Sequence, residues 1–144
     1  MYSDTIARYI DAISKTKRGL RVLIADDLIV EQLAFLEIIR HYLPDSTAKA
    51  VDRSELEAQL NQEGNGYDLV ILEEGFLLNK SGSVDIRQVR NNYPKAKIAL
   101  FVDRENLHQL KTAVRFPDID IIFTKCSTVE AIAEKLCMTF QEAK

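Results

Sequence analysis

Hydrophobic residues in this chain form short unbroken runs, and between the runs they recur at the three- and four-residue spacing of helices. Unbroken apolar runs are typical of strands that are buried on both faces of a parallel sheet. Strands are predicted over residues 21–27, 48–51, 67–75, 96–102 and 120–124. Because a helical pattern follows each strand, the sequence predicts an α/β fold with a doubly wound, five-stranded parallel sheet and right-handed crossovers.

The helical patterns have recognisable beginnings. One runs over residues 30–42, and its apolar stripe consists of Leu33, Leu36, Ile38, Ile39 and Leu43. Ser54 with Glu57 has the spacing of a capping box and predicts the start of a short helix. Ser127 with Glu130 predicts the start of the last helix in the same way. The other apolar markers are Val84, Ile86 and Val89, then Leu107, Leu110 and Val114, and finally Ile132, Leu136, Cys137 and Phe140.

A further helix is predicted ahead of the first strand, from Ser3, a favourable N-cap, to Gly19. Its apolar stripe is formed by Ile6, Tyr9, Ile10 and Ile13. Such a stripe needs another surface against which it can be buried. Two arrangements stay open: packing onto the chain's own domain, for example against the last helix, or contact with a second copy or an upstream partner.

Composition excludes several classes of function. The chain has 144 residues, of which 28% are charged, and its net charge is −3, so neither nucleic acid nor an anionic membrane is expected as a partner. The sequence has no run of about 18 apolar residues and no signal-peptide pattern, and its two cysteines make a disulfide framework improbable. The sequence therefore predicts a soluble, reduced, cytoplasmic domain.

Charged residues stand directly after most of the predicted strands. Parallel strands end at one edge of a sheet, and ligands of such sheets bind there, so these side chains are expected to converge. Carboxylates gathered at close range must bind a cation, pair with a lysine or retain protons. The residues are Asp26 and Asp27, Glu73 and Glu74, Asp103, and Lys125.

Four segments, RVLIADD, YDLVILE, KIALFVD and IIFTK, resemble the signature strands of response-regulator receiver domains. The resemblance extends from residue 21 to the C-terminus and is closest to receivers that precede helix-turn-helix output domains. It implies a flavodoxin-like sheet with the strand order 2-1-3-4-5. The chain would then consist of an N-terminal helical extension, residues 1–19, and a receiver-like domain, residues 20–144.

In receiver domains an acid pair after the first strand holds Mg²⁺, an aspartate after the third strand is phosphorylated, and a lysine follows the fifth strand. The resemblance places Asp26 and Asp27 at the acid pair, Glu73 at the phosphorylated position and Lys125 at the lysine. The candidate metal ligands are therefore Asp26, Asp27 and Glu73. Weak or absent binding is expected, because the longer glutamate arm crowds the octahedral shell of Mg²⁺. In the resting state Lys125 is expected to take the place of the metal.

Three positions depart from the family pattern. Glu73 carries one more methylene than aspartate, which displaces its carboxylate by about 1 Å and can cost about 10²-fold in rate. Asp103 replaces the hydroxyl residue that binds the phosphoryl group, and a like-charge pair at about 4 Å costs about 4 kcal/mol at an effective dielectric of about 20. Ile122 replaces the aromatic switch residue. Asp26, Asp27, Glu73, Asp103 and Lys125 are thus interpreted as the degenerate phosphoacceptor pocket of a pseudo-receiver.

The resemblance implies a non-enzymatic module of two-component signalling that acts through protein–protein contacts and needs no cofactor. Its partner would be a kinase or an output domain, bound at the face formed by the fourth helix, fifth strand and fifth helix. One alternative is a working, Mg²⁺-dependent phosphoacceptor. Another is a Mg²⁺-dependent phosphotransfer enzyme on the same sheet, although the adjacent Asp26 and Asp27 lack the spaced D-x-D pattern of such enzymes. A homodimer through Ile6, Tyr9, Ile10 and Ile13 is a further alternative.

The remaining candidate residues are not expected to take part in the chemistry of the site. Strand alternation is expected to turn Glu74 away from the pocket. Cys126 is expected to be an inert, buried thiol, and Cys137 to lie in the core of the last helix. His41 and His108 have no Cys or His partner at ligand spacing and are given no metal role.

Overall fold

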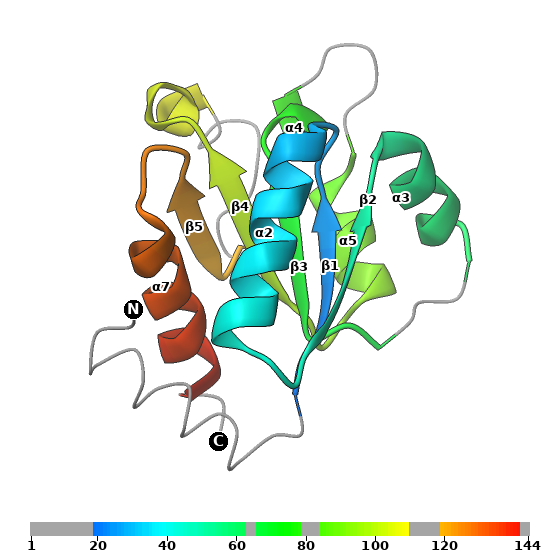
Figure 1. Ribbon diagram of the computed structural model, residues 1–144. Coiled ribbons are helices and arrows are strands. Elements are labelled where there is room, and N and C mark those ends of the chain that lie inside the picture. Colours follow the sequence, from blue (N-terminus) through cyan, green and yellow to red (C-terminus); the bar gives the residue numbers. More distant parts are fainter. Residues whose placement is uncertain (1–18, 63–65, 79–83, 110–118, 142–144) are drawn as a thin grey trace.

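The structure, a computed structural model, describes residues 19–62, 66–78, 84–109 and 119–141 (Figure 1). The predicted leading helix with its stripe lies outside these residues, as does the predicted fourth helix beyond residue 109. The strands form one parallel sheet in the order β2-β1-β3-β4-β5, which confirms the predicted fold class and strand order. No helix within the described ranges is long and apolar enough to cross a membrane.

Each strand falls on one of the predicted segments, although β2 alternates exposed and partly buried residues instead of forming an unbroken apolar run. The strands are β1 (Arg21–Ala25), β2 (Thr47–Val51), β3 (Leu69–Glu73), β4 (Lys97–Val102) and β5 (Ile121–Thr124). In the sheet register Ile24 of β1 pairs with Ile71 of β3, which pairs with Ala99 of β4. The carboxyl ends of the inner strands therefore lie level, and the charged residues that follow them are brought to one edge of the sheet.

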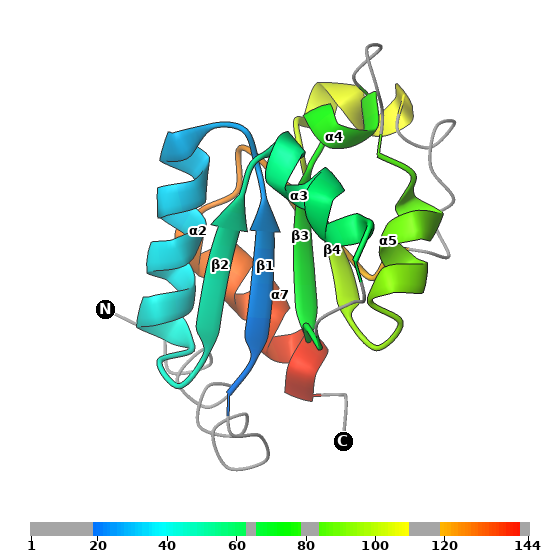
Figure 2. The ribbon, with the colours of Figure 1, turned by 90° about the vertical axis from the view of Figure 1, so that its right-hand side faces the viewer.

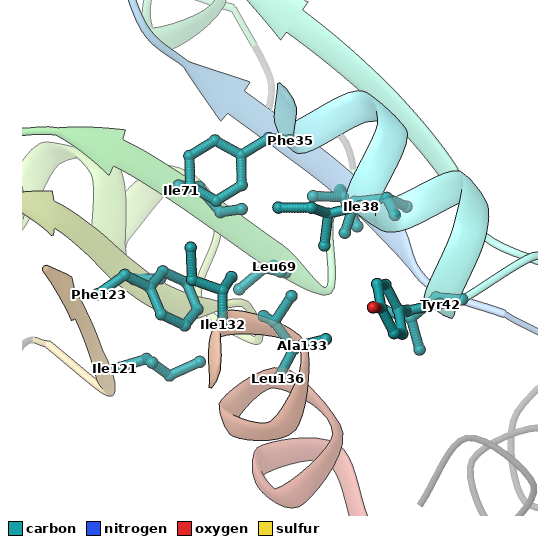
Figure 3. Close-up of a cluster of buried hydrophobic side chains, with 14 of the residues drawn as sticks. Phe35, Ile38, Tyr42, Leu69, Ile71, Ile121, Phe123, Ile132, Ala133 and Leu136 are labelled. Atoms are coloured by element: carbon teal, nitrogen blue, oxygen red, sulfur yellow. The ribbon is translucent and has the colours of Figure 1, made fainter. Parts of the chain in front are cut away.

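Two helices pack side by side on one face of the sheet, α2 (Ile29–Tyr42) and α7 (Val129–Gln141) (Figures 1 and 3). Phe35 of α2 packs edge-on against Phe101 of β4, with the ring centroids 4.8 Å apart. The predicted stripe of α7 is confirmed, because its members are all buried in this core: Ile132, Leu136, Cys137 and Phe140.

The other face is covered by α3 (Arg53–Leu60) and α5 (Ile86–Asn92) (Figure 2). A short helix that the sequence did not predict, α4 (Gly75–Leu78), begins two residues after β3 ends. A 3-10 turn, η1 (Arg104–Asn106), begins two residues after β4. Both stand at the carboxyl edge of the sheet, where they surround the charged residues.

The apolar stripe predicted for α2 is partly wrong. Ile38 and Ile39 are buried as predicted, but Leu33 is 60% exposed. Phe35 and Tyr42 are buried instead. Together with the two isoleucines they have the spacing i, i+3, i+4, i+7, which follows the 3.6-residue helical period more closely than a stripe through Leu33.

The capping box of α3 lies two residues earlier than predicted. Asp52 is the N-cap, and its Oδ1 accepts a hydrogen bond from the Glu55 N–H at 2.9 Å. Glu55 Oε1 accepts from the Asp52 N–H at 3.0 Å, which completes the box. Ser54 and Glu57 lie inside the helix.

The last helix is also capped by a different residue than predicted. Thr128 Oγ1 accepts a hydrogen bond from the Ala131 N–H at 3.1 Å, so the hydroxyl next to the helix acts as the cap. Ser127 instead exchanges a hydrogen bond with Thr124, with 2.7 Å between the two hydroxyl oxygens. The capping box predicted from Ser127 with Glu130 is therefore wrong.

β5 is an outer strand of the sheet (Figure 1). The side chain of Ile122, the predicted switch position, is half-buried and packs against the core that lies under α3 and α5. Its carbonyl oxygen accepts a hydrogen bond from Lys135 Nζ of α7 at 2.8 Å. The last helix therefore reaches around the sheet and contacts the backbone of its outer strand.

Candidate functional site

The charged residues at the carboxyl edge gather around the ammonium group of Lys125. Lys125 Nζ lies 2.7 Å from Glu73 Oε2 and 3.4 Å from Glu31 Oε2. Glu73 ends β3 and Lys125 follows β5, as the sequence predicted, whereas Glu31 in the first turn of α2 is not among the predicted site residues. These side chains are at most 20% exposed, so solvent screens their charges only in part.

Lys125 is held as a cation. Burial alone would lower the pKa of its ammonium group, but the hydrogen bond to Glu73 and the negative charges of Glu73, Glu31 and Glu74 outweigh burial and raise the pKa. Lys125 Nζ also stands 5.5 Å from the centroid of the Phe101 ring, which is within the range of cation–π attraction. Lys125 thus supplies a fixed positive charge at the centre of the site.

Both carboxylate oxygens of Glu73 accept hydrogen bonds. Oε2 accepts from Lys125 Nζ at 2.7 Å, and Oε1 accepts from the Gly75 N–H at 2.8 Å. The side chain can fold back in this way because residue 75 is a glycine, and a β-carbon there would lie 2.7 Å from Oε1. With 12% of its side chain exposed, Glu73 turns toward its own backbone and toward Lys125.

Asp26 is the most deeply buried acid of the site, at 1% exposed. Its Oδ1 accepts a hydrogen bond from the Leu28 N–H at 2.9 Å, but no other residue in the described ranges donates to its Oδ2 or to Glu31 Oε1, which are both buried. Burial, a hydrogen bond to Glu31 and the charges of Glu31 and Glu73 raise the pKa of Asp26 to about 8, against the opposing effect of the Leu28 N–H. At neutral pH the Asp26 carboxyl therefore holds a proton.

Asp27 faces a different neighbour. Its side chain is 49% exposed, and its Oδ1 accepts from the Arg53 N–H at the start of α3 at 2.9 Å. The Arg53 guanidinium lies 4.0 Å from Asp27 Oδ2, donates to the Gly75 carbonyl at 2.8 Å and stacks 4.9 Å from the centroid of the Phe76 ring. Arg53 thus ties together β1, α3 and α4. The role of Arg53 was not predicted from the sequence, because Arg53 directly precedes the expected helix start at Ser54 and does not follow a strand.

Glu74 was expected to turn away from the pocket, but its carboxylate stays at the carboxyl edge of the sheet. Its side chain is 6% exposed. Oε2 accepts from the Asp103 N–H at 2.5 Å, and Oε1 accepts from Asn106 Nδ2. Strand alternation does direct Glu74 and Glu73 to different partners, but the Glu74 carboxylate remains at the edge. It holds the turn after β4, where the resemblance expects the hydroxyl residue.

Two other predicted positions lie apart from the cluster. Asp103 is exposed at the start of η1, and within the described ranges its side chain forms no hydrogen bond or ion pair. Cys126 is exposed rather than buried, in the turn after β5, and its Sγ lies 3.5 Å from Thr124 Oγ1. Cys137 is buried in the core as predicted, and burial, with the charge of Glu134, raises its pKa to about 11.

The residues at this edge do not fit the Mg²⁺ site that the resemblance implies. An octahedral ion needs several free oxygens at about 2.0–2.1 Å. Asp26 is buried with a raised pKa, Asp27 accepts a hydrogen bond from the Arg53 N–H, and Glu73 is held by two hydrogen bonds. In the part of the chain that the structure describes, no group of three or more His, Cys, Asp or Glu side chains is placed to hold a metal ion. The acids of this edge are neutralised by groups of the chain itself. These are the cations of Lys125 and Arg53 and the proton held by Asp26.

Comparison with known proteins identifies the fold of the chain through solved structures alone. No protein-family model and no curated protein sequence matches the chain. Solved structures do match, among them the signal receiver domain of an HD domain-containing protein from Pseudomonas fluorescens, with 16% identity and a TM-score of 0.68 over 89% of this chain and 93% of that one. The fold is that of a receiver domain.

Two further structures share the receiver fold. A response regulator receiver protein from Sinorhizobium medicae has 17% identity and a TM-score of 0.67, over 88% of this chain and 98% of that one. A structure described as an adenylate cyclase from Rhodopirellula baltica has 13% identity and a TM-score of 0.63, over 87% of this chain and 91% of that one. At such identities the likeness shows the fold alone, so the chemistry of the edge must be judged from its own residues.

Proposed function

We propose that this chain is a pseudo-receiver, a signalling module that works through protein–protein contacts without phosphorylation at Glu73. The observation that carries the proposal is the double engagement of the Glu73 carboxylate, by Lys125 Nζ at 2.7 Å and by the Gly75 N–H at 2.8 Å. A carboxylate that attacks phosphorus needs a free oxygen in line with the donor. Glu73 would have to give up a hydrogen bond inside a largely buried cluster to provide one.

The described residues around Glu73 supply no interaction that would compensate for the lost hydrogen bond. Phosphoryl transfer depends on positive charge and hydrogen-bond donors that are placed in advance around the phosphoryl oxygens. Here the Glu31 and Glu73 carboxylates already hold Lys125, and the resemblance's hydroxyl position carries Asp103. A phosphoryl group at Glu73 would compete with Glu31 for Lys125 and would stand close to the acids of the edge.

The partner surface in this proposal includes the edge formed by β5 and α7 (Figure 1). A groove there is lined by Asp120, Ile122, Lys135 and Met138, and Met138 is 39% exposed. Apolar side chains rimmed by charged ones are typical of surfaces that bind other proteins. The partner would be a kinase or an output domain that binds this edge while Glu73 is not phosphorylated.

The proposal is tested by incubating the full chain with Mg²⁺ and a small acyl phosphate, with intact mass and released phosphate measured over time. A phosphorylatable receiver domain treated in parallel serves as the positive control. We expect the mass of this chain to stay unchanged and phosphate release to stay at the rate of the protein-free mixture. Addition of one phosphoryl group would establish a working receiver, and catalytic release without an adduct would establish a phosphotransfer enzyme. Either result would overturn the proposal.

A further inference from the structure

A groove follows the outer side of α2, where this helix lies beside α7 (Figures 1 and 3). It is lined by Ala34, Glu37, Ile38, His41 and Tyr42 of α2 and by Val129 of α7. On α2 the exposed positions Val30, Ala34, Glu37 and His41 are four, three and four residues apart, so they form one stripe along the helix. Val129, which lines the groove, is 50% exposed, and Val30, one turn of α2 before Ala34, is 78% exposed. The groove therefore presents more apolar surface than a solvated helix face requires.

The chain enters the described fold directly beside this groove. Gly19 has a φ of +121°, and a β-carbon there would lie 2.1 Å from the Asp45 carbonyl oxygen, so the backbone passes very close to the turn that ends α2. The Leu20 N–H donates to Ser46 Oγ at 2.8 Å and fixes the contact. Gly19 thus stands beside the turn that follows His41 and Tyr42, at one end of the groove.

The length and chemistry of the preceding segment match the groove. Residues 3–18 would form a helix of about 24 Å, and the 14 residues of α2 span about 21 Å, at 1.5 Å per residue. The segment carries one apolar stripe, and three of its four basic residues lie within four positions of Gly19, which itself stands beside the turn after α2. The C-terminal end of a helix carries a partial negative charge, which favours cations. The three are Lys15, Lys17 and Arg18, and the fourth is Arg8.

From this placement we propose that residues 1–18 form a helix that docks into the α2–α7 groove of its own chain, with Ile6, Tyr9, Ile10 and Ile13 against the stripe on α2. A second copy could supply the same helix, but the tether through Gly19 raises the effective concentration of the chain's own helix far above that of a free copy. The proposal is independent of the phosphorylation chemistry at Glu73. It rests on the groove and on the length and charge of residues 1–18, and on no contact of Glu73.

The experiment measures amide hydrogen exchange over residues 3–18 in the full chain, together with molar mass by light scattering. Ala34→Arg places a guanidinium in the groove, and Ala58→Arg makes the same change at an exposed position of α3, on the other face of the sheet. Ile10→Asp tests the helix side of the contact. Because a charge in an apolar seam must be desolvated, we expect Ala34→Arg and Ile10→Asp to raise exchange over residues 3–18 by at least about tenfold.

We expect the wild-type chain to be monomeric with protected amides over residues 3–18, and Ala58→Arg to leave that protection unchanged. Exchange within β1 and β3 should stay slow in every variant, which shows that the sheet remains folded. The proposal fails if residues 3–18 exchange at the unprotected rate in the wild type, or if Ala34→Arg leaves their protection intact. It also fails if the wild type is a dimer that Ala34→Arg converts to a monomer, because a second copy would then fill the groove.

Discussion

Gly75 leaves room for the Glu73 carboxylate. A β-carbon at position 75 would lie 2.7 Å from Glu73 Oε1, so any larger residue there would displace the carboxylate. The obstructing atom is the end of a flexible side chain, so the fold should tolerate Gly75→Ala while Glu73 loses its hydrogen bond to the Gly75 N–H. We expect a loss of about 1–2 kcal/mol in the free energy of unfolding, measured by urea denaturation. Gly66→Ala is the matched control, because among the described residues its β-carbon would meet Arg21 Nη1 alone, at an ordinary contact distance of 3.7 Å.

The cost of Gly75→Ala should depend on Glu73. In a chain that already carries Glu73→Ala, the added methyl group has no carboxylate to displace, and the loss should shrink to a few tenths of a kcal/mol. An equal loss in both backgrounds would mean that Gly75 is needed for the start of α4 and not for the placement of Glu73.

Replacing Lys125 should expose the mutual repulsion of the acids. Lys125→Met leaves Glu31 and Glu73 without their shared cation, and we expect the free energy of unfolding to fall by about 2 kcal/mol, less than for a fully buried pair because 19% of the lysine side chain is exposed. Adding Glu73→Gln should recover part of the loss. Lys49→Met, on the exposed side of β2, should change stability by less than about 0.5 kcal/mol.

The same variant bears on metal binding. We expect titration calorimetry with Mg²⁺ to detect weak binding or none in the wild type, and tighter binding in Lys125→Met, because the carboxylates then lack a competing cation. A sub-micromolar Mg²⁺ site in the wild type would contradict our description of the edge as neutralised from within.

The pKa of Asp26 predicts a pH dependence of stability. Its folded-state value of about 8 lies above the ordinary value of 3.8, so between these values the folded chain binds more protons than the unfolded chain. The contribution of Asp26 to stability is therefore full below about pH 4 and is lost as the pH rises through about 8, by up to about 1.4 kcal/mol per pH unit. Urea denaturation at a series of pH values measures this slope.

Asp26→Asn isolates that contribution. The amide is neutral at every pH and can donate to Glu31 Oε1, so the variant should gain stability relative to the wild type as the pH rises from about 5 to about 8. Asp85→Asn serves as the control, because residue 85 is the exposed N-cap of α5 and asparagine caps about as well as aspartate. Parallel stability curves for the wild type and Asp26→Asn would show that Asp26 is not protonated in the fold.

Phosphorylation should require more than one substitution. Glu73→Asp shortens the arm but leaves Lys125 bound to Glu31 and Asp103 at the hydroxyl position, so we expect no phosphoryl adduct from an acyl phosphate and Mg²⁺. Glu73→Asp combined with Asp103→Thr restores both positions, and intact mass should then show a Mg²⁺-dependent adduct. An adduct on the single variant would show that the glutamate arm was the sole obstacle.

The strands follow from the sequence because burial on both faces favours unbroken apolar runs, such as Val22–Ala25 and Leu69–Leu72. Their order was expected from the resemblance to receiver domains and not from these runs. The cap of α3 does not follow from local sequence. Asp52 with Glu55 and Ser54 with Glu57 have the same spacing, and the choice is made by a tertiary contact, since Asp27 Oδ1 accepts the Arg53 N–H and fixes the first turn.

The site was predictable where residues follow strands and not where they lie on helices. Asp26, Glu73 and Lys125 are positioned by the parallel sheet, so their meeting could be expected from sequence. Glu31 reaches the same cluster from the first turn of α2, and the available signal, an acid at the start of a helix that itself starts at this edge, also describes ordinary first-turn acids. Cys126 was misplaced because the outward turn after β5 depends on the Thr124–Ser127 hydroxyl pair.

The bond from Lys135 Nζ to the Ile122 carbonyl has a consequence for how this protein behaves among its own copies. An outer strand offers unpaired backbone groups on which a strand from another molecule can add, and a charged side chain at such an edge discourages that addition. A neighbouring strand that approached β5 would have to displace the ammonium group and leave it without its acceptor. The last helix of the fold thereby limits growth of the sheet beyond β5 and protects the chain, when concentrated, from edge-to-edge aggregation.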